Sequence, residues 1–195
     1  MSTMAYRYTK EIPWHGMKDD DKVSLIATIE GLRAGAAISH MSADGTDIGM
    51  DILAICADHD LAVSARPVMT SNDIIVARSP RAIRGLHEGS IALDEFLGYP
   101  RCCSDAYLKQ IRYTKDTPPT LRNAALYWSN ARDALEDGRY PLALLYALHV
   151  PCAIDCAPSK MTAVRIKDVV ERVDPVLAHE YSRNRLRCIL SQGGA

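Results

Sequence analysis

The sequence predicts an α+β protein that is mostly helical, with a small N-terminal helix–hairpin lobe followed by a helical bundle that carries a cysteine site. Three observations predict this class. Apolar residues recur at helical spacing along most of the chain. Two short stretches rich in Val and Ile, at 61–68 and 73–77, interrupt this pattern and favour an antiparallel hairpin. Prolines and glycines divide the chain after residue 98 into further helices.

The predicted lobe covers residues 21–97 and follows an N-terminal extension formed by residues 1–20. Apolar residues between Val23 and Leu32 fall on one face of its first helix. The pair Ser79-Pro80 is typical of a helix start, because serine caps a helix and proline fits its first position. The expected elements are a helix at 22–40, a loop at 41–46, a helix at 48–59, the hairpin, a helix from 79–80 to Leu86 and a helical turn at 91–97.

The helical part covers residues 98–195, and together with the lobe it is expected to form a single compact domain over 21–195. Clear breaks are expected at 116–120, which contains two adjacent prolines, and at Asp137-Gly138. The expected helices lie at 101–112, 120–136, 141–149, 158–172 and 174–190.

Composition and charge exclude some classes of function. The chain is 48% hydrophobic with a formal net charge of -1, which argues against bulk attraction to nucleic acid or to an anionic membrane. No apolar run approaches the ~20 residues needed to span a bilayer, and the first residues lack the apolar core of a signal peptide. We therefore expect a cytoplasmic protein without a membrane partner, in which thiols are kept reduced.

Six cysteines in such a chain favour ligands, catalytic groups or packing residues over a disulfide framework. Cys56 and Cys188 lie among apolar residues at helical spacing, so we expect both to be packing residues. The other four lie in two proline-containing turns that each lead into a predicted helix. They are Cys102 and Cys103 in the first turn, and Cys152 and Cys156 in the second.

These two turns predict a metal site. A helix N-terminus favours the anionic thiolate that binds metals, and the spacing of Cys152 and Cys156 brings both thiols to one side of a turn. Adjacent side chains diverge, so Cys102 and Cys103 suit a cluster better than one small ion. We expect an iron–sulfur cluster, of the 4Fe–4S type, and three protein ligands would leave an open iron. The alternatives are Zn2+ in a non-catalytic binding module, and a thiol redox switch.

The expected function is that of an iron–sulfur enzyme acting on a small molecule at the open iron, with lyase, sulfur-transfer and redox chemistry all left open. His149 and Tyr99 flank the two turns and are the candidate catalytic residues for handling protons. An electron- or sulfur-donor protein is a further expected partner. Oligomerisation is compatible with the sequence.

The two cysteine segments also resemble a known family. The run from Leu97 to Cys103 and the residues His149-Val150-Pro151-Cys152, with Cys156, are similar to the motifs of the prokaryotic family called domain of unknown function 483. The resemblance covers roughly residues 22–170, as judged from the two motifs and from the order of elements before them, which is helix, helix, short hairpin and helix. It implies that the four cysteines act as one functional unit, and it implies no particular reaction.

Overall fold

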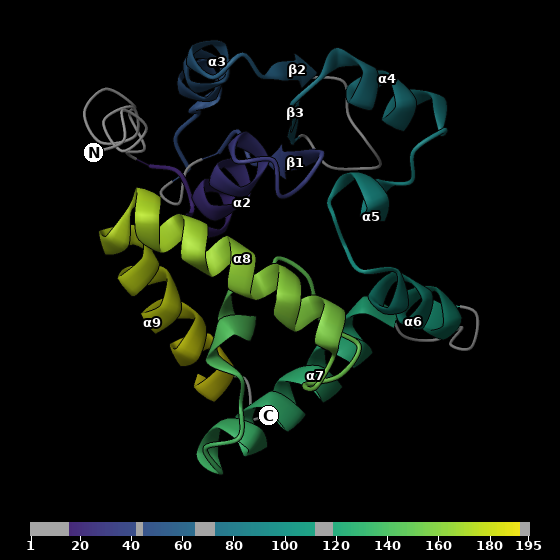
Figure 1. Cartoon of the computed structure of the whole chain (residues 1–195), viewed down its shortest axis with the longest axis vertical. Helices are drawn as coiled ribbons and strands as arrows, with labels where there is room; N and C mark the ends of the chain where they lie inside the picture. Colours follow the sequence, from purple (N-terminus) through teal and green to yellow (C-terminus); the bar gives the residue numbers. More distant parts are fainter. Residues whose placement is uncertain (1–15, 42–44, 65–72, 112–118, 192–195) are drawn as a thin grey trace. The chain divides into compact units, whose positions relative to one another are not determined.

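The computed structural model describes residues 16–41, 45–64, 73–111 and 119–191. Within these residues helices predominate and the sheet has three strands, which confirms the mostly helical α+β class (Figure 1). The chain divides into two compact units. Unit 1 contains residues 1–98 and 168–178, and unit 2 contains residues 99–167 and 179–195. The expectation of a single domain over 21–195 stays a prediction.

Unit 1 is built on an antiparallel sheet with the strand order β1-β3-β2. The central strand β3 (Ile74–Ala77) pairs with β2 (Ala62–Ser64), which confirms the predicted antiparallel pair. It also pairs with β1 (Gly35–Ile38), where Gly35 lies opposite Ala77. Strand β3, which is buried, therefore lies between β1 and β2.

The first predicted helix, at 22–40, is wrong in its second half. Helix α2 spans Asp19–Ile29 and ends before Gly31, which has a φ of +74° that favours glycine and reverses the chain. The residues that follow form β1 instead. A side chain at Gly35 would clash with the Phe96 ring, so β1 packs very closely against Phe96 at this position.

Helices cover both faces of this sheet. Side chains at alternate positions, such as Ile38 and Val76, pack with α2 and with α3 (Gly49–Asp58). The intervening positions, Ile75 and Ala77, pack with α4 (Pro80–Glu88) and α5 (Leu93–Phe96). Because both faces are covered, all four residues of β3 are buried.

The predicted helix starts in unit 1 are well supported. The Ser79 hydroxyl accepts a hydrogen bond from the Ala82 amide at 3.2 Å, which confirms Ser79 as the cap of α4. The expected helices at 48–59 and 91–97 correspond to α3 and α5. Several predicted segments lie outside the described residues: the extension before residue 16, residues 65–68 of the first predicted hairpin strand, the whole turn between the two hairpin strands, and parts of the breaks at 41–46 and 116–120.

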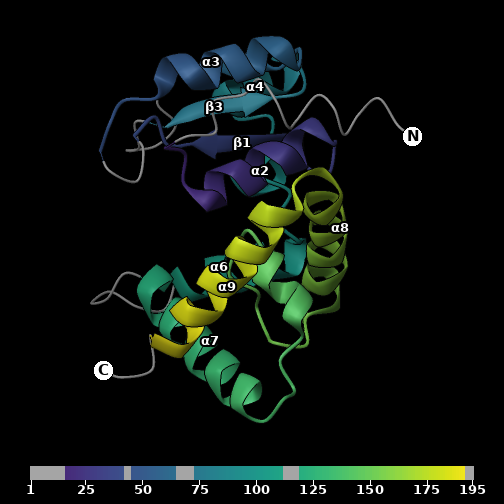
Figure 2. The same ribbon diagram turned by 90° about the vertical axis from the view of Figure 1, so that its left-hand side faces the viewer.

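Unit 2 contains α6 (Arg101–Ile111), α7 (Pro119–Glu136), a short 3₁₀ helix η1 (Leu142–Tyr146) and most of α8 (Ala157–Val173) and α9 (Pro175–Ser191). Helices α6 and α7 contact each other, and their order along the chain can be followed in Figure 2. Among the described residues, we find no helix that combines the length and hydrophobicity of a membrane span.

The helix predicted at 141–149 is wrong in type and in length. Only η1 forms, and the chain from residue 147 to residue 156 is irregular. The Arg185 side chain of α9 donates hydrogen bonds to the carbonyls of Leu145 and Ala147, at 3.4 and 3.2 Å. These tertiary contacts satisfy carbonyls that a longer helix would have used, and they fix the segment that enters the cysteine loop.

Aromatic residues hold the same region of unit 2 together. The Arg185 guanidinium lies 5.7 Å from the ring centroids of both Trp128 and Tyr181. The Tyr127 and Tyr140 hydroxyls lie 3.0 Å apart and are both buried. This packing gives the cysteine loop a rigid support.

Candidate metal centre

The first turn of α6 presents two of the four cysteines. Gly98 ends the preceding segment with a φ of +71°, and Pro100 follows just before the helix. The Pro100 carbonyl accepts hydrogen bonds from the amides of Cys103 and Ser104, at 2.9 and 3.1 Å. Cys102 and Cys103 are therefore placed at the start of the helix, where its dipole favours anionic sulfur.

The other two cysteines lie in the irregular loop that precedes α8. Pro151 is buried at the start of this loop, and the Cys156 amide donates to the Ala153 carbonyl at 3.2 Å, which closes a turn. The Cys156 carbonyl accepts from the Lys160 amide at 3.0 Å, so Cys156 immediately precedes the helix. Cys152 and Cys156 thus face the same side of one turn, as the sequence predicts.

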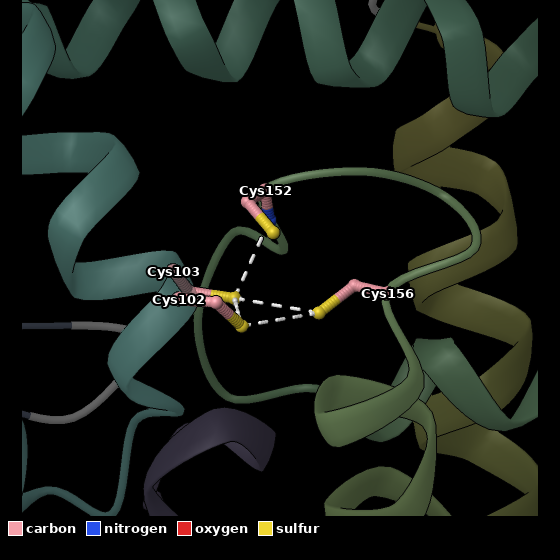
Figure 3. A group of neighbouring side chains, drawn as sticks. All are labelled: Cys102, Cys103, Cys152 and Cys156. Atoms are coloured by element: carbon pink, nitrogen blue, oxygen red, sulfur yellow. Dashed lines mark hydrogen bonds between the residues drawn. The ribbon is translucent and has the colours of Figure 1, made fainter.

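All four sulfurs come together in unit 2. Their Sγ atoms lie within 4.8 Å of one another, and Figure 3 shows the four side chains pointing toward a common centre. The Sγ atom of Cys102 lies 3.9 Å from that of Cys103 and 3.6 Å from that of Cys156, and the Sγ atoms of Cys103 and Cys156 lie 3.8 Å apart. A group of four thiols this close can hold a metal ion or a cluster.

The divergence expected of adjacent cysteines does not occur. The sulfurs of Cys102 and Cys103 both lie close to that of Cys156, because they belong to one side of the first turn of α6 (Figure 3). The reason for preferring a large cluster to a single ion is therefore removed.

The separations can be compared with those of a tetrahedral site. Metal–sulfur bonds of about 2.3 Å place the sulfurs of a tetrahedron about 3.8 Å apart. The three resolved separations, between 3.6 and 3.9 Å, agree with that value. In a 4Fe–4S cluster each cysteine binds a different iron, so the cysteine sulfurs lie farther apart than in a single-ion site. The separations among Cys102, Cys103 and Cys156 match a single ion, the Cys152 sulfur lies within 4.8 Å of the others, and the donor set fits either group chemically.

Burial divides the four cysteines into two pairs. Cys103 and Cys156 are buried, with 7% and 8% of their surface exposed. Cys102 and Cys152 are exposed. The centre therefore has one side against the protein interior and one side open to solvent.

Polar groups surround the buried pair. The Ser159 side chain, which is fully buried in the first turn of α8, has its Oγ 3.2 Å from the Cys103 sulfur and 2.8 Å from Nε2 of His149. With a metal bound, Cys103 would be a thiolate that only accepts hydrogen bonds, so the hydroxyl would donate to Cys103 and accept from Nε2–H of His149. The Cys152 amide also donates to the Cys103 sulfur, at 3.4 Å. The buried thiolate is thus held by two donors.

Tyr99 and His149, the expected catalytic residues, lie together beside this centre. Their rings are 5.2 Å apart, between centroids, and tilted by 34°. His149 reaches the sulfurs through Ser159. The sequence analysis did not select Ser159 as a site residue and so missed its contact with sulfur, although its position three residues after Cys156 at a helix start indicates a shared face.

The thiols differ in their acidity. Burial acts to raise the pKa of Cys156, but hydrogen bonds from the Ser159 side chain and backbone, with smaller ones from Cys102 and Cys152, lower it to about 7. Burial and the neighbouring thiols raise the pKa of Cys102 and of Cys152 above the usual range. Before any metal binds, Cys156 is therefore the first of the three to ionise.

The remaining cysteines are not members of this group. Cys56 is buried in the core of unit 1, and burial raises its pKa to about 11, which confirms it as a packing residue. Cys188 is half-buried in α9. Arg101, beside Cys102, is exposed and lies 3.9 Å from the Asp105 carboxylate.

Comparison of the chain with models of known protein families, with curated protein sequences and with solved structures finds no match. The resemblance to domain of unknown function 483 therefore stays a prediction. What the site can do must be inferred from its own geometry.

Proposed function

We propose that this chain is a metalloprotein in which Cys102, Cys103, Cys152 and Cys156 bind one metal ion in a tetrahedral thiolate site. The spacing of the sulfurs carries the proposal, because the separations among Cys102, Cys103 and Cys156 are those of a single four-coordinate ion and the Cys152 sulfur lies within 4.8 Å of these three. Zn2+ is the ion we favour, since it binds four thiolates readily and imposes no other geometry.

The bound ion would connect two parts of unit 2. Cys102 and Cys103 belong to α6, whereas the other two ligands belong to the loop that enters α8. That loop has no regular secondary structure. Binding to both segments would hold the loop against the first turn of α6, so part of the binding free energy would stabilise the fold.

An iron–sulfur enzyme is the second candidate, and the open side of the centre favours it. Cys102 and Cys152 are exposed, so they can spread to the wider spacing that a 4Fe–4S cluster requires. A small-molecule substrate would reach the cluster from that side, with His149 and Tyr99 handling protons and a donor protein supplying electrons or sulfur. This candidate keeps the expected cytoplasmic setting.

Elemental analysis separates the candidates. The full chain is purified without oxygen, and zinc, iron and acid-labile sulfide are measured per chain. We expect about one zinc and no sulfide, as four thiolates suit one ion. The Cys103→Ser variant should lose the metal, whereas the matched control Cys188→Ser should retain it.

Other results point elsewhere. Iron with an equal amount of acid-labile sulfide would contradict the zinc site and support the iron–sulfur enzyme. A metal-free chain that remains folded, in which oxidation joins two of the four cysteines, would contradict both and favour the thiol redox switch.

A further inference from the structure

The two sides of the cysteine centre differ in hydrogen bonding as well as in burial. On the buried side, the Cys103 sulfur receives the Ser159 hydroxyl and the Cys152 amide. Cys156 is buried on the same side, with its sulfur 3.8 Å from that of Cys103. On the open side, the resolved contacts of the Cys102 sulfur are with the sulfurs of Cys103 and Cys156.

This difference affects reactivity. A hydrogen bond to a thiolate withdraws charge from the sulfur and makes it a weaker nucleophile, and burial prevents an electrophile from reaching it. Both effects act on Cys103, and burial protects Cys156 as well. The exposed Cys102 and Cys152 combine access with the negative charge that metal binding maintains at neutral pH.

We propose that Cys102 and Cys152 form a reactive face of the metal centre that accepts an alkyl group from a soft carbon electrophile. The proposal rests on the proposed function, because the metal keeps these thiols ionised. The surface beside the loop suits such a reagent, since Val150, 39% exposed, offers an apolar contact two residues before Cys152.

In the reaction, the thiolate sulfur attacks the carbon and a carbon–sulfur bond forms. The bond from that carbon to its leaving group breaks, and the leaving group departs with the electron pair. Nothing is oxidised or reduced, and the metal-bound thiolate becomes a neutral thioether. The substrate class is therefore an alkyl donor whose leaving group is stable as it departs with the electron pair.

Limited alkylation of the zinc-loaded full chain tests this. The chain is treated with less than one equivalent of iodoacetamide, the zinc content is measured, and the modified cysteine is found by peptide mass spectrometry. We expect the first adduct on Cys102 or Cys152, on the order of tenfold ahead of Cys103 and Cys156. The Cys188→Ser variant should behave as the unaltered chain does.

A second measurement separates reactivity from folding. The same treatment is applied to the zinc-loaded chain and to the chain unfolded in denaturant, and the lead of Cys102 and Cys152 over Cys103 and Cys156 should be present in the folded chain and lost in the unfolded one. A zinc-loaded chain modified first at Cys103, Cys156 or Cys188 would overturn the reactive face and leave the proposed function intact. A chain that binds no metal in the elemental analysis overturns the proposed function and this proposal together.

Discussion

Replacing Ser159 by alanine removes the hydroxyl that connects His149 to the metal centre. This side chain is fully buried, lies 3.2 Å from the Cys103 sulfur and lies 2.8 Å from the His149 ring nitrogen. Water cannot easily replace it. The Cys103 thiolate would lose one of its two donors, and the His149 N–H would lose an acceptor.

The size of the effect follows from these contacts. Hydrogen bonds to charged groups contribute about 1.5–3 kcal/mol. Loss of a group that supports a metal ligand lowers metal affinity by about 10- to 100-fold, which corresponds to a similar free energy. We therefore expect Ser159→Ala to bind zinc more weakly by about 10- to 100-fold.

Competition for zinc with a chelator of known affinity measures this change. Ser182→Ala is the matched control, because its hydroxyl also makes a hydrogen bond within unit 2, to the Tyr146 hydroxyl at 2.9 Å. The control should keep the affinity of the unaltered chain. Equal affinity in Ser159→Ala and the unaltered chain would refute the role given to this hydroxyl, as would an equal loss in both variants.

Three further predictions concern acidity, metal removal and packing. Zinc affinity should fall with decreasing pH already above 7, because protons compete for Cys102 and Cys152, whose pKa values are raised, and it should fall more steeply below about 7, where protons also compete for Cys156, whose pKa is lowered to about 7; titration of affinity against pH measures this. Chelation should lower the melting temperature, since the ion joins α6 to the loop before α8, and calorimetry with and without chelator detects the shift. Tyr127→Phe should lower the free energy of unfolding by about 1–3 kcal/mol, because the buried Tyr140 hydroxyl loses its partner at 3.0 Å. The double variant with Tyr140→Phe should recover part of this loss, as measured by denaturant unfolding.

Much of the helical structure could be predicted from periodicity and from its end signals. The start of α4 at Pro80 follows from a serine cap, and α8 and α9 begin within one residue of their predicted positions. These signals are local, so they can be recognised without knowledge of the fold.

The errors occur where distant contacts decide the conformation. The segment of β1 is rich in alanine, which favours a helix, yet it pairs with β3 forty residues later in the chain. The segment after Leu142 has apolar residues at helical spacing, but Arg185 binds its carbonyls from α9. Neither partner can be identified from the local pattern.

The cysteine site shows the same division. The four residues could be chosen from their two proline-containing turns, and the structure brings these turns together. The orientation of the two adjacent thiols could not be predicted, because it depends on the rotation of the first turn of α6. The contact of Ser159 with sulfur depends on how α8 faces α6, and no single segment of sequence specifies that relation.

X-ray absorption at the metal edge of the metal-loaded full chain tests the single-ion centre most directly. Four sulfur neighbours at about 2.3 Å, with no second metal in the next shell, are the result that the proposed site predicts. Scattering from a second metal, or replacement of sulfur by nitrogen or oxygen ligands, would contradict it.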